Sequence, residues 1–209
     1  MSNINFINKV SNYWYRYPDG GKINFYDGKV VFRTPTETIF RILGNSGFNY
    51  KNKNILDIGF GSGNDLLEFK RRGAKIHGID IRKKIVEIFI KNNKLNNKNF
   101  FVCDLNKDFP KVKSMDLINC RDTIYYIDLE KQLEFIRNCA SSLKQNGLLL
   151  FQYIQDQFKE KKSTLFNYDL RNGFTKFRKF HTKSPVLSLK DYHVKNLIQY
   201  SNLKFQNSI

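Results

Sequence analysis

The chain has 209 residues, of which 41% are hydrophobic and 15% aromatic, and its formal net charge is +17. This length and composition predict one ordinary domain with a sizeable core and exclude a chain that is disordered throughout. No apolar stretch approaches the roughly 20 residues that span a bilayer, and the N-terminus shows no secretory signal. The cysteines and histidines show no metal-ligand spacing, and the odd cysteine count argues against a disulfide framework. We therefore expect a cytoplasmic protein without a membrane span, a metal or disulfides.

Two explanations of the positive charge stay open. A basic protein suggests a nucleic-acid partner. However, the chain contains 26 Lys, 24 Asn, 20 Ile and 19 Phe, all with A/T-rich codons, and only 10 of its 36 basic residues are Arg. Because base and phosphate recognition favours the forked arginine side chain, codon composition is the preferred explanation. A nucleic-acid partner stays open but is not favoured.

Residues 1–50 are rich in aromatic and turn-forming residues. The stretch from Tyr13 to Gly21 predicts an irregular segment that follows a short helix. A second helix is predicted to begin at Thr34, because Pro35 suits the first helical position and Glu37 completes a capping box.

From Asn54 onward, short apolar strands alternate with amphipathic helices. The predicted strands are 55–58, 75–79, 100–103, 115–119 and 148–154. The predicted helices are 64–72, 82–95 and 129–143. This alternation is typical of βαβ units and predicts an α/β, Rossmann-like, doubly wound and mainly parallel sheet of six or seven strands with helices on both faces. The less regular remainder predicts an exposed strand at 174–180, an amphipathic helix at 189–201 and a last strand at 203–208.

A glycine-rich loop, Asp57-Ile58-Gly59-Phe60-Gly61-Ser62-Gly63, joins the first of these strands to the following helix. Glycines at alternate positions permit a tight turn and a close approach of the backbone to a ligand. Asp80 ends the next strand, 21 residues beyond Gly59, which is the spacing at which an acidic side chain reaches ribose hydroxyls. Asn64 stands where a dinucleotide fingerprint has Gly or Ala. The sequence therefore predicts a nucleoside site of another kind.

The segment from Leu56 to Gly63 resembles the first motif of the class I S-adenosylmethionine-dependent methyltransferases. The resemblance covers 54–154, about half of the chain. It includes Asp80 as the ribose acid, 103–105 as the segment whose Asp contacts the adenine amine, and 116–127 as the segment that borders the sulfonium. It implies a methyltransferase with S-adenosyl-L-methionine as cofactor, although a Rossmann-like domain that binds another nucleotide stays open. The implied cofactor-binding residues are Asp57, Gly59, Phe60, Gly61, Gly63, Asp80, Ile81, Asp104, Leu105, Asn119, Cys120 and Arg121.

The resemblance also implies a domain organisation, with residues 1–50 as a helical and aromatic lid and residues 51–209 as the cofactor-binding domain. Packing of the aromatic residues against the sheet edge is the alternative to a lid. For deprotonation of the methyl acceptor, the candidate catalytic residues are Tyr125 and His181.

Three functions stay open for a member of this family. Compact size and the lack of an added recognition domain favour a small-molecule or glycan-precursor substrate, methylated on oxygen or nitrogen. The charge supports an RNA or protein methyltransferase as the alternative, although no N/D-P-P-Y/F motif of base-specific amino-methyltransferases follows the fourth strand. A catalytically inactive S-adenosylmethionine-binding protein is the third. Nothing in the sequence indicates the oligomeric state.

Overall fold

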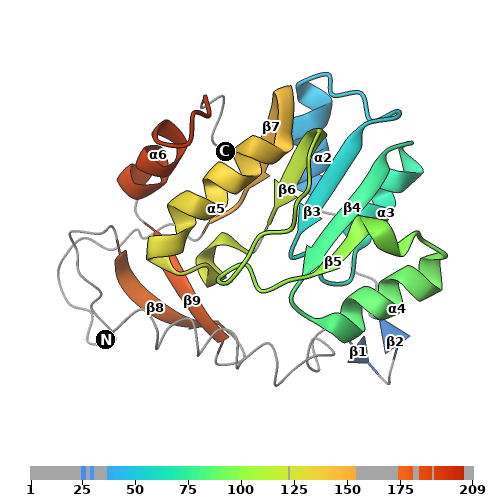
Figure 1. Cartoon of the computed structure of the whole chain (residues 1–209), viewed down its shortest axis with the longest axis horizontal. Helices are drawn as coiled ribbons and strands as arrows, with labels where there is room; N and C mark the ends of the chain where they lie inside the picture. The colour runs from blue at the N-terminus through green and yellow to red at the C-terminus, as the bar shows by residue number, and fades with distance from the viewer. Residues whose placement is uncertain are drawn as a thin grey trace.

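The centre of the molecule is a five-stranded parallel sheet with the strand order β5-β4-β3-β6-β7 (Figure 1). The computed structural model describes residues 25–26, 29–30, 37–121, 123–153, 174–180, 184–189 and 191–204. The doubly wound parallel architecture expected from the sequence is confirmed. Five of the six or seven expected strands lie in the sheet of this described part, and most of the expected last strand, 203–208, lies outside it. The five strands are β3 (Asn54–Ile58), β4 (Lys75–Asp80), β5 (Phe100–Val102), β6 (Met115–Cys120) and β7 (Leu143–Phe151).

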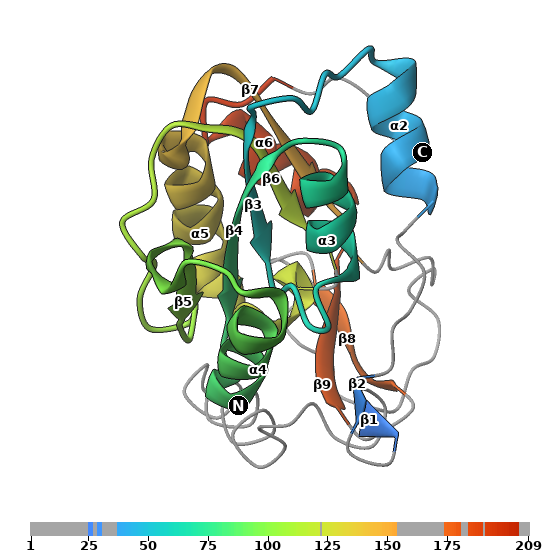
Figure 2. The ribbon, with the colours of Figure 1, turned by 90° about the vertical axis from the view of Figure 1, so that its right-hand side faces the viewer.

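Helices cover both faces of this sheet (Figure 2). On one face, α2 (Glu37–Asn45), α3 (Asn64–Arg71) and α4 (Lys83–Asn93) share a core with the sheet residues Ile55 and Leu117. On the other face, α5 (Leu129–Ser142) and α6 (Asp191–Gln199) pack on Leu56, Ile118 and their neighbours. Successive residues of a strand point to opposite faces. The central strands β3 and β6 are therefore buried on both sides, as the strands of parallel sheets commonly are.

Two hairpins lie on the side of the sheet where β3 and β4 end (Figures 1 and 2). One pairs β1 (Phe25–Tyr26) with β2 (Lys29–Val30), and the other pairs β8 (Phe174–Phe180) with β9 (Ser184–Leu189). The expected strand at 174–180 is thus confirmed. Within the described residues it pairs with β9 alone, so it does not extend the central sheet. Strand β9 contacts the short helix η3 (Ile124–Tyr126), which follows β6.

Several element boundaries differ from the expected ones by a few residues, and two of these differences have a visible cause. Strand β7 begins at Leu143 and not at Leu148, because a register shift against β6 absorbs the predicted turn: Asn146 has a positive φ of 64° and the ladder continues past it. Helix α4 ends at Asn93 because Lys94 adopts a left-handed conformation with a φ of 48°. The predicted cap residues of α2, Thr34 and Pro35, lie outside the described residues.

An ionic cluster around Asp116 ties three strands together at the amino end of the sheet. Asp116 accepts hydrogen bonds from Lys53 (3.2 Å), Lys144 (2.7 Å) and the backbone amide of Asn54 (2.9 Å). Burial raises the pKa of Asp116, but these donors outweigh burial and hold the pKa below its ordinary value. The ionised carboxylate thus joins β6 to β7 and to the start of β3, at the edge opposite the glycine loop.

We expect Asp116→Asn to lower the free energy of unfolding by about 1–2 kcal/mol at neutral pH, since charged hydrogen bonds are lost while both lysines are partly solvated. A folded-state pKa below the unfolded value of about 3.9 stabilises the fold above that value, and the contribution disappears as the pH falls through the folded-state pKa. Urea unfolding at neutral and at acidic pH measures both effects. Glu134→Gln, which breaks the exposed pair with Lys131, is the control and should change stability by less than about 0.5 kcal/mol. A similar loss in both variants would contradict the assignment.

Candidate functional site

The glycine loop is built from three residues in the left-handed region: Gly59, Gly61 and Gly63 have φ values of 71°, 57° and 76°. A Cβ atom at Gly59 would overlap Thr123, and one at Gly63 would overlap the ring of Phe89. The protein's own packing therefore requires two of the glycines. At Gly61 a Cβ atom would lie 3.5 Å from Nη2 of Arg82, in ordinary contact. Gly61 is therefore not required by the packing of the core, and the nearest neighbour of its outer face is the side chain of Arg82.

Asp80 ends β4 beside this loop and is buried. Its Oδ1 atom accepts hydrogen bonds from the backbone N–H and from Nε of Arg82, both at 2.9 Å. Its Oδ2 atom accepts from the backbone N–H of Gly61 at 3.0 Å and from Nη2 of Arg82 at 2.9 Å. Burial raises the pKa of Asp80, but the Arg82 charge and these hydrogen bonds outweigh burial and leave the pKa below its ordinary value. An ionised carboxylate is therefore held against the backbone of the glycine loop.

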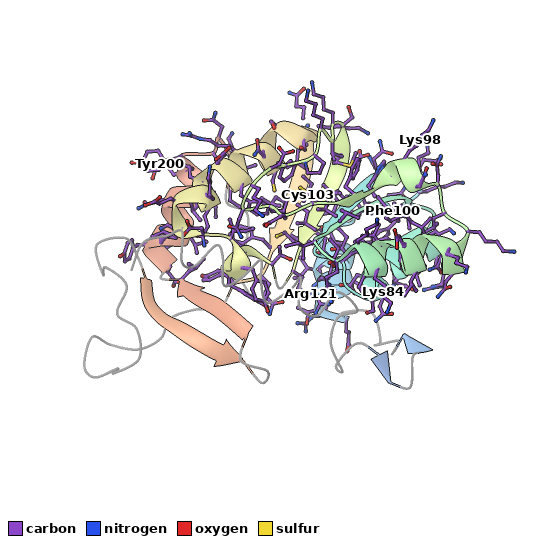
Figure 3. The ribbon with its side chains drawn as sticks, turned by 60° about the horizontal axis from the view of Figure 1, so that its bottom comes forward. Lys84, Lys98, Phe100, Cys103, Arg121 and Tyr200 are labelled. Carbon is purple, nitrogen blue, oxygen red and sulfur yellow. The ribbon has the colours of Figure 1, made fainter. Side chains whose placement is uncertain are left out.

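The point where the strand order reverses lies between β3 and β6, and ligands bind at this point in open α/β sheets. Asp57 and Asn119 are paired there in the sheet register, and the Asn119 amide donates to Oδ1 of Asp57 at 3.0 Å. Burial and the neighbouring carboxylate of Asp65 raise the pKa of Asp57 well above its ordinary value. Arg121 forms an ion pair with Asp65, with Nε 3.4 Å from Oδ2. Figure 3 shows Arg121 on the side of the molecule where the two hairpins lie.

The short helix η3 is held by a buried side chain of α5, which in turn contacts α6. The fully buried Gln132 of α5 donates from Nε2 to the carbonyl oxygens of Ile124 (3.3 Å) and Ile127 (3.1 Å). Its Oε1 atom lies 3.0 Å from Nε2 of His193 on α6. Since the Gln132 amide nitrogen is committed to carbonyls, Oε1 is the acceptor and His193 donates. Both ends of η3 are thus tied to α5 and, through it, to α6.

The loop after β5 holds η3 from another direction. Asn106 donates from Nδ2 to the carbonyl oxygen of Tyr126 at 3.0 Å and accepts from the backbone N–H of Asp128 at 2.7 Å. Its own backbone N–H donates to Oδ1 of the buried Asp104 at 3.2 Å. The start of η3 is fixed to the glycine loop, because the Thr123 hydroxyl donates to the carbonyl oxygen of Ile58 at 3.0 Å. The segment after β6 is therefore a rigid neighbour of the loop.

A small apolar cluster joins η3 to the C-terminal elements. Tyr125 packs with Leu189 of β9 and with Val194 and Ile198 of α6, and all four are buried. Further aromatic side chains border this cluster, with the rings of Tyr125 and Tyr126 centred 4.8 Å apart. These borders are Tyr126, Phe151 and Tyr153. The cluster attaches the β8–β9 hairpin to the segment that follows β6.

The comparison with known families decides the identity of this arrangement. A family model described as a methyltransferase domain matches residues 31–190. The chain belongs to the class I S-adenosylmethionine-dependent methyltransferases. S-adenosyl-L-methionine is the cofactor of this family.

Among characterised relatives of this methyltransferase, phosphoethanolamine N-methyltransferase of Plasmodium falciparum is 34% identical over 135 residues, which are 59% of this chain and 50% of the relative. The ubiquinone biosynthesis O-methyltransferase of Coxiella burnetii is 27% identical over 112 residues, or 52% of this chain and 47% of the relative. The chain spans about half the length of these curated relatives. Magnesium protoporphyrin IX methyltransferase of Synechocystis, solved with bound S-adenosylmethionine, has the same fold, with a TM-score of 0.65, 15% identity, and coverage of 97% of this chain and 88% of that one.

Most of the predicted cofactor residues of the methyltransferase lie at one edge of the sheet, at or just after the carboxyl ends of β3, β4, β5 and β6. Two of the predicted side chains lie in the core. Phe60 packs against Phe89 and Phe100 with ring centroids 5.1 and 6.1 Å away, and Cys120 is fully buried. The backbone of Phe60 also bonds within the protein, with its N–H donating to Ile79 and its carbonyl oxygen accepting from Gly63. The residues at the shared edge are Asp57, Gly59, Gly61, Gly63, Asp80, Ile81, Asp104, Leu105, Asn119 and Arg121.

The structure describes only one of the two predicted catalytic residues. Tyr125 is 8% exposed and belongs to the cluster beside η3. His181 lies outside the described residues, as does Asp122, which follows Arg121. Neither catalytic role is tested by the fold, and both stay predictions.

Three residues that shape the site are absent from the sequence-based set. Arg82 donates two side-chain hydrogen bonds to the Asp80 carboxylate, and the Thr123 hydroxyl donates to a carbonyl oxygen beside the glycine loop. Gln132 donates to a carbonyl oxygen of η3. A signal existed for Gln132: it shares helical spacing with the apolar Phe135, Ile136 and Cys139, so a polar residue stands on the buried face of a helix. Arg82 and Thr123 gave no such signal, because their contacts depend on how the loops fold.

We searched the described part of the chain for a metal site, a membrane-spanning helix and a reactive thiol. There, no group of three His, Cys, Asp or Glu side chains could hold a metal ion. None of its helices is long and apolar enough to cross a membrane. Burial, with Asp108 and Asp104 nearby, raises the pKa of the Cys103 thiol to about 11. Cys103 is therefore a poor nucleophile at neutral pH.

Proposed function

We propose that this methyltransferase acts on a small molecule, with a glycan precursor included in that class, and methylates an oxygen or nitrogen atom. The observation that carries the proposal is the cluster of Tyr125 with Leu189, Val194 and Ile198. It fastens the β8–β9 hairpin and α6 to the segment that follows β6. The chain's own elements thus stand beside the acceptor side of the site, where a macromolecular substrate would need an open surface.

The relatives support the same class of acceptor. Both characterised relatives described above carry names that specify small molecules, one an N-methyltransferase of phosphoethanolamine and the other an O-methyltransferase of ubiquinone biosynthesis. The aromatic side chains at the cluster suit an acceptor with an apolar body or an amine, since a cation is attracted to an aromatic face. We include both oxygen and nitrogen acceptors for this reason.

Each predicted cofactor residue takes a proposed role. The glycine loop, Asp57 and Asn119 border the methionine part and the sulfonium, together with Arg121 and the backbone of Cys120. Asp80 accepts from the ribose hydroxyls and Ile81 packs beside the adenine. Asp104 and Leu105 border the adenine amine and ring. The backbone of Phe60 belongs to the same loop.

Positioning is the main task of the remaining residues. S-adenosylmethionine supplies an activated methyl group, so the protein must hold the acceptor in line with it, which can contribute several kcal/mol to catalysis. The clamped η3 segment provides that rigidity. Tyr125 and His181 are the proposed groups that accept the acceptor's proton. Residues 1–50 are proposed as a lid, of which helix α2 packs on the sheet, with 51–209 as the cofactor-binding domain.

A methyl-transfer screen tests the acceptor class. The purified full chain is incubated with methyl-labelled S-adenosylmethionine and with separate pools of phosphorylated and plain amines, phenols and quinols, glycan precursors, total RNA and protein. We expect label in one small-molecule pool, and mass spectrometry identifies the methylated atom. Label in RNA or protein alone would overturn the small-molecule proposal. Cofactor binding by calorimetry without transfer to any pool would favour an inactive binding protein.

RNA binding is expected to be weak and independent of sequence. The positive charge is explained by lysine-rich composition, so a short single-stranded RNA should dissociate as salt rises, with a log–log slope of about −0.7 for each phosphate contact. Fluorescence anisotropy at several salt concentrations, with and without S-adenosylmethionine, measures this. Tight, sequence-selective binding near physiological salt would support the RNA-methyltransferase alternative.

A further inference from the structure

We infer that Arg82 competes with the cofactor's ribose for Asp80, so that the protein's own side chain sets the affinity for S-adenosylmethionine. The inference rests on the proposed role of Asp80 as the ribose acid. It adds a residue that neither the glycine motif nor the family resemblance assigns. Asp80 accepts four hydrogen bonds, and two of them come from the Arg82 side chain.

Asp80 has no acceptor capacity left for a diol. A carboxylate offers about four lone-pair positions, and four donors lie within 2.9–3.0 Å of its two oxygens. Two of the donors are backbone N–H groups, from Gly61 and Arg82, and these are fixed by the end of β4 and the loop. The other two are Nε and Nη2 of the Arg82 guanidinium. A ribose with two hydroxyl donors can therefore bind both oxygens only by replacing the guanidinium.

The guanidinium also lies where the nucleoside would have to lie. Its Nη2 atom is 3.5 Å from the position of a Cβ atom at Gly61, on the outer face of the glycine loop. Arg82 and Asp80 are both buried, at 6% and 3% exposure. The pair is therefore seated on the loop and is not a surface ion pair that extends away from it.

On this inference, the Arg82 side chain moves from Asp80 toward the surface when the ribose binds. It precedes the first residue of α4, and the neighbouring Lys83 and Lys84 side chains are exposed, with Lys84 at the surface in Figure 3. A long arginine side chain that swings toward this surface regains water around its charge. The backbone N–H of Arg82 keeps its bond to Oδ1 while the side chain moves, so Asp80 stays in place for the incoming hydroxyls.

Competition of this kind lowers the apparent affinity by the fraction of molecules in which Asp80 is accessible. Arg82→Met keeps the length of the aliphatic stem and removes the competing donors. We expect Arg82→Met to bind S-adenosylhomocysteine at least about tenfold more tightly than the parent chain, because a competing charged hydrogen-bonded pair is removed. Its own melting temperature should fall, since Asp80 loses its partner charge.

Isothermal titration calorimetry with S-adenosylhomocysteine, and with its analogue that lacks both ribose hydroxyls, provides the test. The gain in Arg82→Met should appear with the natural nucleoside and vanish with the dideoxy analogue. Arg71→Met, which removes an exposed arginine paired with Glu68 on α3, is the matched control and should leave both affinities unchanged. Weaker binding of the natural nucleoside by Arg82→Met would overturn competition and make Arg82 a cofactor contact.

Asp80→Asn separates this inference from the underlying assignment. If Asp80 receives the ribose, this variant binds S-adenosylhomocysteine more weakly than the parent chain and no longer distinguishes it from the dideoxy analogue. Unchanged binding by Asp80→Asn would place the ribose elsewhere and defeat the assignment of Asp80 itself. Weaker binding by Asp80→Asn with no gain in Arg82→Met would retain the assignment and defeat competition alone.

Discussion

Gly61→Val is expected to lower the affinity for S-adenosylmethionine by at least about 100-fold, which corresponds to roughly 2.7 kcal/mol. Gly61 has a φ of 57°, a conformation that a β-branched residue adopts only under strain. The added side chain would stand beside Nη2 of Arg82 on the outer face of the loop. It would fill the space through which the nucleoside approaches the backbone. Calorimetric titration of the folded variant measures the loss.

The neighbouring glycines would not give an equally clean experiment. A side chain at Gly63 would overlap the ring of Phe89 in the core, so its substitution would test folding before binding. Gly47 is the matched control: its φ is 68° and no heavy atom lies within 4 Å of its Cβ position. Gly47→Val therefore introduces the same kind of backbone strain but leaves the glycine loop unobstructed. Its affinity for S-adenosylmethionine should equal that of the parent chain. Retained affinity in Gly61→Val would show that the nucleoside does not lie on this loop.

Gln132→Leu is expected to lower the free energy of unfolding by about 2–4 kcal/mol, because it leaves two buried carbonyls and a partly buried imidazole without their partner. The affected groups are the carbonyls of Ile124 and Ile127 and the His193 ring. Since η3 loosens while the glycine loop is untouched, kcat should fall and cofactor affinity should stay near the parent value. Denaturant unfolding and steady-state kinetics measure the two effects.

A control for this variant is available on α6. Gln199 is exposed, so Gln199→Leu should change stability by less than about 0.5 kcal/mol and leave kcat unchanged. If Gln132→Leu kept the parent kcat at a temperature where it remains folded, η3 would have no role in placing the acceptor. Loss of cofactor affinity in proportion to kcat would instead indicate that the glycine loop depends on Gln132.

The sequence predicted those parts of the fold that repeat a local pattern. The strand at 54–58 and the glycines after it are recognisable because a buried strand, a tight turn and a helix start each require particular residue types. The same holds for Asp80, whose distance from Gly59 is set by one βα unit. Parallel pairing then brings their carboxyl ends to one edge, which is why the predicted residues at this edge come together.

Contacts between separate loops could not be predicted in this way. Thr123 contacts the glycine loop across 65 positions of sequence, and Asn106 contacts the end of η3 and Asp128 across 20 and 22 positions. These contacts depend on the packing of irregular segments, which have no periodic pattern. A sequence motif also does not show where each of its side chains points. Phe60 lies inside the motif and was predicted to bind the cofactor, and its ring packs in the core with Phe89 and Phe100.

The raised pKa of Asp57 links ligand binding at this site to the release of protons. Its pKa is raised well above the ordinary value by burial and by Asp65, so its carboxyl group binds a proton more readily than an exposed aspartate does. A sulfonium cation beside it would favour the ionised form, so binding would release protons at pH values between the pKa of the free protein and that of the complex. The demethylated product carries no such charge, so it should release fewer protons on binding. The complex with the methyl donor and the complex with the demethylated product would then bind different numbers of protons. Calorimetric titrations in buffers of different ionisation enthalpy would measure the protons released by each ligand and so distinguish the two.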